Sequence, residues 1–328
     1  MKKKLVVLTA LVLCLAVLAG CGTVPQNNSA APDNTNNANA ADAWKPVTVT
    51  DDMGRSVTIE QEPKHVAVIM GSFADVWVLA GGSMVATVND AWEDFHLELG
   101  PEVKNLGKYN AVSTEMLFSV EADLVIASSN TKKQVELKDT LEAAKVPVLY
   151  FEINEFSDYL RMLKACTDIT GRADLYEKNG LKIQEQIEKV KSAAADAVKT
   201  AGAPKVLFIR AAASGIHAKG STGTVLGPML RDLGCVNIAD GSELLDKLSM
   251  EVIIKEDPDM IFIVQQGNDD EGTKKMISET LTSNPAWSGL KAVKEDKVFQ
   301  LEKNLYHLKP NARWAEAYEK LEKIIYGK

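Results

Sequence analysis

The cysteine at position 21 is the residue whose surroundings define its chemistry most narrowly. It directly follows the tripeptide Leu-Ala-Gly at 18–20, and before that come lysines at 2–4 and an apolar run over 5–18. A basic start, a short apolar run and small residues before a cut are typical of a secretory signal, and this run is too short for a stable membrane span. A cysteine at this point resembles a lipobox. We therefore expect residues 1–20 to be a lipoprotein signal peptide and Cys21 to be acylated, for example with palmitate.

Residues 21–43 have the composition of a tether. They are rich in asparagine and alanine and contain no aromatic residue, so they cannot build a core. A flexible coil of this length reaches roughly 25 Å. Each buried methylene of an acyl chain contributes about 0.8 kcal/mol to membrane binding, so two or three chains anchor stably. We expect a body that begins at residue 44 and is lipid-anchored on the outside of a bacterial cell membrane.

Two pairs of carboxylates share one spacing. Glu115 precedes Asp123 by eight positions, and Glu251 precedes Asp259 by the same eight; each glutamate also follows a serine by two positions. A serine at the N-cap and a glutamate in the first turn stabilise a helix by a few tenths to about 1 kcal/mol each. Helix capping is therefore one interpretation. The other is that a two-fold partner binds both glutamates at once.

Other kinds of site find little support. The four histidines, at 65, 96, 217 and 307, are scattered, so a zinc or manganese binding protein is a less favoured alternative. A lipid-anchored hydrolase is equally disfavoured, because the chain has no Gly-x-Ser-x-Gly, His-Glu-x-x-His or P-loop motif. We expect no enzymatic activity.

The net charge of the chain is negative. Loss of residues 1–20 would change the formal charge from −8 to −11, which argues against a nucleic-acid partner. Cys166 and Cys235 are expected to be buried thiols, with a single disulfide between them as the alternative.

Short β-branched runs alternate with helical patterns along the body. A hairpin is expected at 47–50 and 56–59, where a glycine lies in the turn. The later runs are continuously apolar, which is typical of parallel strands covered on both faces by helices; they lie at 66–69, 85–88, 124–127, 148–151, 206–209, 236–238, 260–264 and 298–301. The sequence therefore predicts an α/β fold with two lobes of mainly parallel sheet, an N-terminal lobe at 44–172 and a C-terminal lobe at 204–328.

A long helix is predicted between the lobes. Apolar residues recur three or four positions apart from Tyr176 to Ala197, which indicates one amphipathic helix over about 173–200 within a connecting segment, 173–203. Such a helix would be roughly 40 Å long, more than one lobe needs. Gly180 is expected to mark a bend. The ligand cleft is expected between the two lobes that this helix joins.

The chain resembles the extracytoplasmic substrate-binding proteins of ABC importers for ferric siderophores, haem and cobalamin. The resemblance depends on the order of several short segments: 49–55 (Val-Thr-Asp-Asp-Met-Gly-Arg), 63–66 (Pro-Lys-His-Val), Glu115 with 123–126 (Asp-Leu-Val-Ile), 257–259 (Asp-Pro-Asp) and 284–287 (Asn-Pro-Ala-Trp) before 297–299 (Lys-Val-Phe). It implies one rigid connecting helix, a cleft ligand, and a permease dimer with ATPase subunits on which Glu115 and Glu251 dock. It also implies a monomer without a resident cofactor.

Ligand-binding residues are expected in loops after the carboxyl ends of the strands. That rule indicates Phe73, Trp92, Tyr109 and Ser128 in the first lobe and Arg210, His217, Gln265, Tyr306 and His307 in the second. The resemblance further places Tyr109 in the family's ligand loop and His217 at the cleft. Tyr109 and His217 could then ligate haem iron axially. A ferric siderophore would instead use aromatic and basic groups, and cobalamin would need apolar walls. We favour an iron complex, siderophore or haem, with cobalamin as the alternative.

Overall fold

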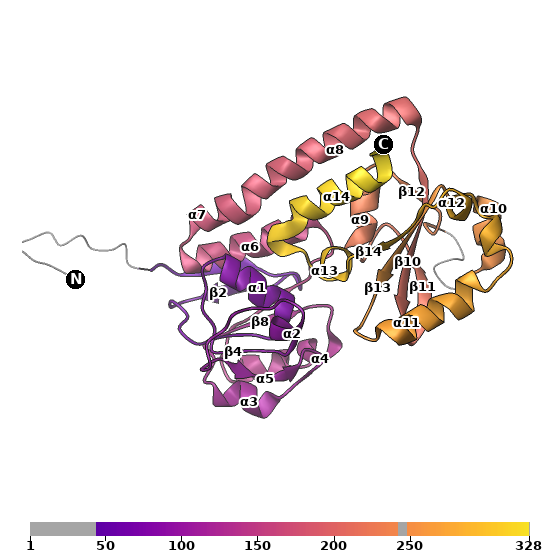
Figure 1. Cartoon of the computed structure of the whole chain (residues 1–328). Helices are drawn as coiled ribbons and strands as arrows, with labels where there is room; N and C mark the ends of the chain where they lie inside the picture. Colours follow the sequence, from indigo (N-terminus) through magenta and orange to yellow (C-terminus); the bar gives the residue numbers. More distant parts are fainter. Residues whose placement is uncertain (1–43, 242–247, 328) are drawn as a thin grey trace, which may run out of the picture. The chain divides into compact units, whose positions relative to one another are not determined.

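The computed structural model describes residues 44–241 and 248–327. The predicted signal peptide, Cys21 and the tether lie outside the described residues. From Trp44 onward the chain forms one unit, in which two α/β lobes lie side by side beneath a long helix (Figure 1). No helix within the described ranges has both the length and the apolar character needed to cross a membrane.

The N-terminal lobe is built on a parallel five-stranded sheet. Its strand order is β5-β4-β3-β8-β9, with bounds Lys104–Asn105, Ala86–Thr87, Val66–Val68, Leu124–Ser128 and Val148–Phe151. All five residues of β8 are buried, as the continuously apolar run predicted. Two antiparallel ladders complete the lobe: β1 (Val47–Thr50) with β2 (Ser56–Ile59), and β6 (Gly107–Lys108) with β7 (Ala111–Val112).

Helices cover both faces of this sheet. Alternate strand residues pack toward α1 (Gly71–Leu79) and α6 (Phe156–Thr170) on one face, and toward α3 (Thr114–Ser119) and α5 (Lys138–Ala143) on the other. The short helices α2 (Asp90–Glu93) and α4 (Lys132–Val135) lie in the loops after β4 and β8. Residues one position apart on a strand therefore serve opposite layers.

The C-terminal lobe repeats the plan with one change. Its sheet has the order β11-β10-β13-β14, and β12 also pairs with β10; the bounds are Gly215–Lys219, Lys205–Ala212, Met260–Gln265, Val298–Leu301 and Val236–Asn237. All pairings are parallel except that of β11, an antiparallel strand absent from the sequence prediction. The helices are α9 (Leu226–Asp232), α10 (Met250–Glu256), α11 (Asp270–Ile277), α12 (Lys291–Lys294), α13 (Lys303–Tyr306) and α14 (Trp314–Tyr326), with a π-helical turn at Ser278–Thr282 and short 3-10 turns at Trp287–Gly289 and Asn311–Arg313.

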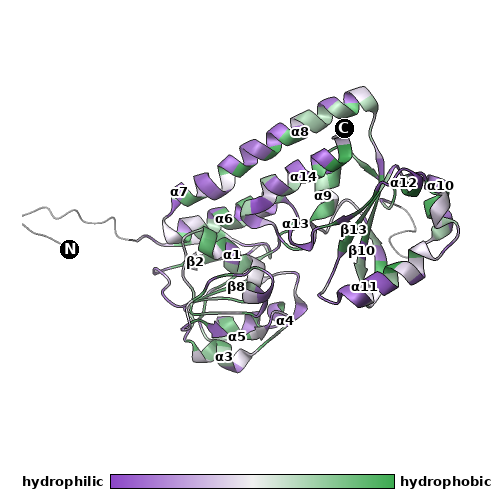
Figure 2. Cartoon of the chain, viewed as in Figure 1, coloured by the Kyte–Doolittle hydropathy of each residue, from purple (hydrophilic) through white to green (hydrophobic). Residues whose placement is uncertain are grey.

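The connecting helix consists of α7 (Ala173–Tyr176), a π-helical turn (Glu177–Leu181) and α8 (Lys182–Ala201). The π turn contains Gly180, where the sequence predicted a bend. A Cβ on Gly180 would lie 3.0 Å from Leu160 of α6, so the two helices approach closely here. Gly202, with φ of 85°, follows the last turn of α8. The outward face of α8 is hydrophilic, as an amphipathic helix requires (Figure 2).

The lobes are joined by more than this helix. One hydrophobic core contains residues from the inner faces of both sheets together with α6, α8, α9 and α14. Helix α14 packs along α8 (Figure 1), and its buried Trp314 meets Phe156 of α6 edge-on with 6.0 Å between ring centroids. Cys166 and Cys235 belong to the same core; both are free and buried, as predicted.

Candidate ligand-binding site

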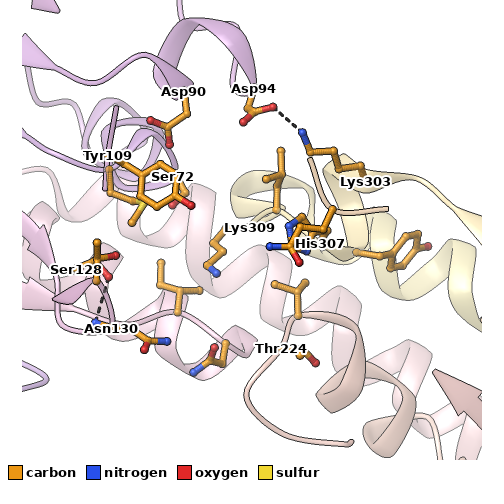
Figure 3. Close-up of a pocket in the computed structure, with 18 of the residues that line it drawn as sticks. Ser72, Asp90, Asp94, Tyr109, Ser128, Asn130, Thr224, Lys303, His307 and Lys309 are labelled. Atoms are coloured by element: carbon orange, nitrogen blue, oxygen red, sulfur yellow. Dashed lines mark hydrogen bonds and ion pairs between the residues drawn. The ribbon is translucent and has the colours of Figure 1, made fainter. Parts of the chain in front are cut away.

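A cavity of about 490 Å³ lies between the two lobes, in the range typical of small-molecule sites. Its walls come from the loops at the carboxyl ends of the parallel strands in both sheets, the usual ligand position in open α/β sheets. Ser72, Asp90 and Tyr109 from the N-terminal lobe face His307 and Lys303 from the C-terminal lobe across it (Figure 3). The fold therefore places polar and charged groups from two sheets around one space.

Six of the nine residues predicted as ligand-binding line this cavity, namely Phe73, Tyr109, Ser128, Arg210, Tyr306 and His307. Tyr109 occupies the turn between β6 and β7, and 42% of its surface is exposed. The Tyr306 hydroxyl donates to the carbonyl of Ala317 in α14 at 3.0 Å, so its polar end is already engaged.

The other three predicted residues, Trp92, Gln265 and His217, lie outside the lining. Trp92 lies in helix α2, two positions after the cavity residue Asp90. Two positions of helix turn its side chain by about 200° from that of Asp90, and Trp92 packs against the core. Gln265 ends β13 and donates to Asp270 at 2.7 Å, whereas its neighbour Gln266 lines the cavity.

His217 pairs directly with Arg210 on the antiparallel strand β11. It is exposed and lies one strand farther out than Arg210, beyond the cavity. The lining of this cavity therefore includes Tyr109 but not His217, with which Tyr109 was predicted to form a facing pair. The histidine that lines it together with Tyr109 is His307.

A buried glutamine holds three loops of the N-terminal wall. The Gln134 side chain accepts from the Ser128 amide at 2.7 Å and donates to the carbonyls of Ile69 at 2.6 Å and Tyr109 at 2.8 Å. Gln134 is fully buried, so these bonds exchange little with water. The sequence analysis did not single out this residue, because a lone glutamine in a helical segment carries no motif.

Among the described residues that line the cavity, the acidic ones, Asp90, Asp94 and Glu152, all belong to the N-terminal wall. Asp90 accepts from the Gly71 amide at 3.0 Å, and a Cβ on Gly71 would lie 2.7 Å from that carboxylate, so only glycine fits there. Burial raises the pKa of Asp90, with the Gly71 hydrogen bond acting in the opposite direction. Glu152 accepts from Asn130 at 3.0 Å and from Asn154 at 2.7 Å.

The lysine and arginine residues of the described lining, Arg210, Lys303 and Lys309, all belong to the C-terminal wall. Lys303 is 2.9 Å from Asp94 and donates to Asn268 at 2.6 Å. Arg210 and Lys309 form no ion pair or side-chain hydrogen bond with any described residue, and the Nε of Arg210 is buried. Burial lowers the pKa of both groups. Partly buried cations without a partner among the described residues are unfavourable unless a ligand compensates their charge.

His307 lies among these cations. Burial, followed by the charges of Arg210, Lys309 and Lys303, lowers the pKa of His307 to about 4. The imidazole is therefore neutral at pH 7, the form that accepts a hydrogen bond or ligates a metal. Within residues 44–241 and 248–327, no three His, Cys, Asp or Glu side chains are arranged to hold a metal ion.

The repeated carboxylates occupy equivalent places in the two lobes. Glu115 and Glu251 lie in the first turns of α3 and α10, and both are exposed. The aspartates have a backbone role: Asp123 accepts from the amides of Lys64 and His65 at 2.7 and 2.9 Å, and Asp259 accepts from that of Lys205 at 2.8 Å. Glu115 and Glu251 have no side-chain partner among the described residues.

Comparison with known proteins agrees with this architecture. Residues 66–305 match the periplasmic binding protein family. Over its whole length the chain is similar to the uncharacterised ABC transporter substrate-binding lipoprotein YvrC of Bacillus subtilis, with 27% identity covering 99% of this chain and 98% of YvrC. The Fe(3+)-citrate-binding protein YfmC of the same organism is 23% identical, covering 93% and 91%.

A solved structure shares the fold. Staphylococcus aureus SirA, complexed with staphyloferrin B, superposes with a TM-score of 0.65 at 22% identity, covering 85% of this chain and 97% of SirA. The predicted α/β fold and the family resemblance are thereby confirmed. With a matching segment that spans well over half of its length, this chain belongs to the periplasmic binding protein family.

Proposed function

We propose that this protein is the substrate-binding component of an ABC importer and captures an anionic ferric chelate. The observation that carries this proposal is the pair of cations, Arg210 and Lys309, that line the cavity without a partner among the described residues. Carboxylate, catecholate or hydroxamate oxygens of a chelate would supply the missing charge through charge-assisted hydrogen bonds. The similarity to a relative named as an Fe(3+)-citrate-binding protein supports the same ligand class.

The remaining lining fits a chelate better than a bare ion. The exposed ring of Tyr109 offers a flat surface to an organic ligand, and Ser72, Ser128 and Asn130 offer polar atoms beside it (Figure 3). Since the cavity has no cluster of metal ligands among its described residues, the iron would be bound by its chelator and the chelate by the protein. The protein's part is binding and delivery without bond making or breaking.

Haem is the second candidate, and one observation favours it. Tyr109 and the neutral His307 line the cavity from opposite lobes, and both side chains are known haem iron ligands. The haem propionates would then meet Arg210 and Lys309. Cobalamin is less well supported, because the three cations and three carboxylates of the lining leave little continuous apolar wall.

A titration panel tests this assignment. Purified protein would be titrated with ferric citrate, a ferric catecholate siderophore, haemin and cobalamin, with tryptophan fluorescence and visible absorption as readouts. We expect saturable quenching by at least one anionic ferric chelate. A shifted Soret band that changes in Tyr109→Ala and His307→Ala would select haem instead, and a response to cobalamin alone would refute the iron assignment.

We also propose that the loaded protein docks on a permease dimer through Glu115 and Glu251. Both carboxylates are exposed and unpaired among the described residues, and they occupy equivalent corners of two similar lobes. Partly desolvated ion pairs at an interface fix its register, so two pairs would orient the cavity over the translocation path. ATPase subunits would drive the transport, and the binding protein itself would act as a monomer.

Docking and capping make different predictions. Glu115→Gln with Glu251→Gln should reduce cellular uptake to background while ligand affinity stays unchanged, if the residues dock. If they only cap helices, uptake should survive and stability should fall by at most about 1 kcal/mol. The control is Glu185→Gln with Glu319→Gln, two exposed helical glutamates without a described partner.

The site of action follows from Cys21. We propose that an acylated Cys21 holds the protein on the outer surface of the cell membrane, as the names of two similar lipoproteins suggest. Mass spectrometry of the native protein should find lipid on an N-terminal Cys21. An unmodified N-terminus beyond this residue would contradict the anchor.

A further inference from the structure

One ion pair crosses the cavity from wall to wall. Asp94 follows α2 in the N-terminal lobe, Lys303 begins α13 in the C-terminal lobe, and the lysine Nζ lies 2.9 Å from the aspartate Oδ1 (Figure 3). Their side chains are 23% and 20% exposed. Among the cavity-lining residues that the structure describes, this is the one ion pair that joins the two lobes.

The two partners are held differently. Lys303 also donates to Asn268 Oδ1 of its own lobe at 2.6 Å, so its ammonium stays at the cavity wall when the ion pair is broken. The Asp94 carboxylate has no other partner among the described side chains. Loss of the pair would therefore leave a cation positioned for a ligand and an anion free to turn toward water.

The pair is not needed to keep the lobes together. The fully buried Asn311 donates to the Ser72 carbonyl at 2.9 Å and to Asp75 at 2.8 Å, which links the C-terminal chain to α1 from inside. The shared hydrophobic core lies behind this link. The bond between Asp94 and Lys303 can thus break at the edge of the cavity without separation of the lobes.

We propose that Asp94 is a specificity-determining residue that selects ligands by charge. Arg210 and Lys309 are available to any anion, whereas Lys303 is available only to a ligand whose negative charge displaces Asp94. A highly charged chelate would bind Arg210, Lys309 and Lys303 together. A neutral chelate would leave the ion pair between Asp94 and Lys303 intact and would bind next to Asp94. This inference rests on the proposed function, since it concerns the charge of the same ligand.

The test compares Asp94→Asn with wild type, using ferric citrate and a neutral ferric trihydroxamate as probes. Asp94→Asn removes the competitor for Lys303 and should bind ferric citrate about fivefold more tightly, the size expected for a partly exposed ion pair. Lys303→Gln should bind it about fivefold more weakly. Affinity for the neutral trihydroxamate, if it binds, should not change in Asp94→Asn.

The matched control is Glu302→Gln, which removes one negative charge directly beside Lys303 in sequence. Glu302 pairs with Lys320 at 2.8 Å and does not line the cavity, so its loss should leave both affinities at wild-type values. An equal gain in Glu302→Gln and Asp94→Asn would mean that net charge alone is responsible, and would overturn the proposal.

A second measurement does not need a ligand. Hydrogen exchange of the backbone amides in residues 90–97 and 302–309 should be faster in Asp94→Asn and in Lys303→Gln than in wild type, and unchanged in Glu302→Gln. If no ferric probe binds to wild type but hydrogen exchange is faster in both variants, the ion pair between Asp94 and Lys303 is supported and the assignment of a ferric ligand is refuted. If ferric citrate binds and neither affinity nor exchange changes in Asp94→Asn, the proposal fails and the ligand assignment stands.

Discussion

The two lobes share a backbone plan but present opposite charges to the cavity. Strands β4-β3-β8-β9 of the first sheet correspond in order to β12-β10-β13-β14 of the second. The resemblance extends to single residues. Glu121 has a positive φ of 51°, and Asp257 has a positive φ of 42°. Each lies two positions before the aspartate that directly precedes a strand. Yet all three carboxylates of the lining come from the first lobe and all three cations from the second.

This contrast separates what the fold needs from what the ligand needs. Each lobe has a residue with positive φ and, two positions later, an aspartate that accepts a hydrogen bond from a backbone amide at or just before the start of the neighbouring strand. These residues lie at the amino ends of the strands, where they stabilise the start of the sheet. The charged residues of the cavity lie toward the carboxyl ends of the strands: Arg210 is near the end of β10, and the others are in the segments that follow the strands. A cavity between two similar lobes can therefore have one anionic and one cationic wall, and a chelate with a charged periphery can be oriented by both.

The largest effect is expected from the cationic wall. Arg210→Gln and Lys309→Met should each weaken binding of an anionic ferric chelate tenfold to a hundredfold, because a charge-assisted hydrogen bond contributes about 1.5 to 3 kcal/mol. Isothermal titration calorimetry would measure the losses. Thermal stability should stay constant or rise, since each change removes a partly buried cation whose charge is not compensated by a described residue.

The control for the cationic wall is Lys108→Met, at an exposed lysine of the other lobe that does not line the cavity. Its affinity should match that of wild type. Losses of similar size in all three variants would show that the overall charge of the protein, and not the positions of Arg210 and Lys309, governs binding.

The next effect concerns pH. The folded pKa of His307 is about 4, against an unfolded pKa of about 6.5, so between these values the unfolded chain holds the extra proton. The free energy of unfolding should therefore fall as pH drops through this window, by about 2 kcal/mol from this residue between pH 7.5 and 5. Above pH 7 the contribution should be flat.

Urea unfolding of wild type and His307→Gln at several pH values isolates this contribution, because every other titrating group is present in both proteins. The difference between the two should shrink or reverse toward pH 5. His96→Gln, at an exposed histidine outside the cavity, serves as the control. Parallel pH profiles for wild type and His307→Gln would contradict the assignment of a neutral, buried imidazole.

The smallest effect tests how closely the lobes repeat. Ser113 caps α3 by accepting from the Met116 amide at 3.3 Å, whereas Ser249 makes no such bond at α10. Ser113→Ala should therefore lower the free energy of unfolding by about 0.5 to 1 kcal/mol, and Ser249→Ala by less. Chemical denaturation would measure both. Equal losses would mean that the two caps are the same in solution.

The sequence predicted most of the sheets because parallel strands covered on both faces are continuously apolar. It missed β11, where Ile216 and Ala218 alternate with His217 and Lys219 between two glycines, since five residues of this kind do not stand out from a loop. It also placed an ordinary bend where the chain forms a π-helical turn at Gly180. Such a turn depends on the close approach of α6, which is a tertiary contact.

For the site, we used the rule that ligand-binding residues follow the carboxyl ends of the strands. This rule identified the correct segments of the chain but not always the correct side chains within them. Gln265, the last residue of β13, donates to Asp270, whereas the next residue, Gln266, lines the cavity. Asp90 lies in the same short helix as Trp92, and Asp94 directly follows that helix; both aspartates line the cavity, whereas Trp92 packs against the core. Lys303 and Lys309 follow β14 and satisfy the same rule, so the sequence could have identified them as candidates. It could not show that Lys309 lacks a partner among the described residues, which is the observation that makes this lysine informative.

The shared hydrophobic core has a consequence for folding. Since residues from both inner sheet faces, α8 and α14 belong to one cluster, neither lobe retains a complete core when the other unfolds. The body should therefore melt in a single cooperative transition despite its two sheets. A ligand that binds only the native state would raise the melting temperature of the whole body. Truncation of α14, the last helix, would unfold the first lobe as well as the second.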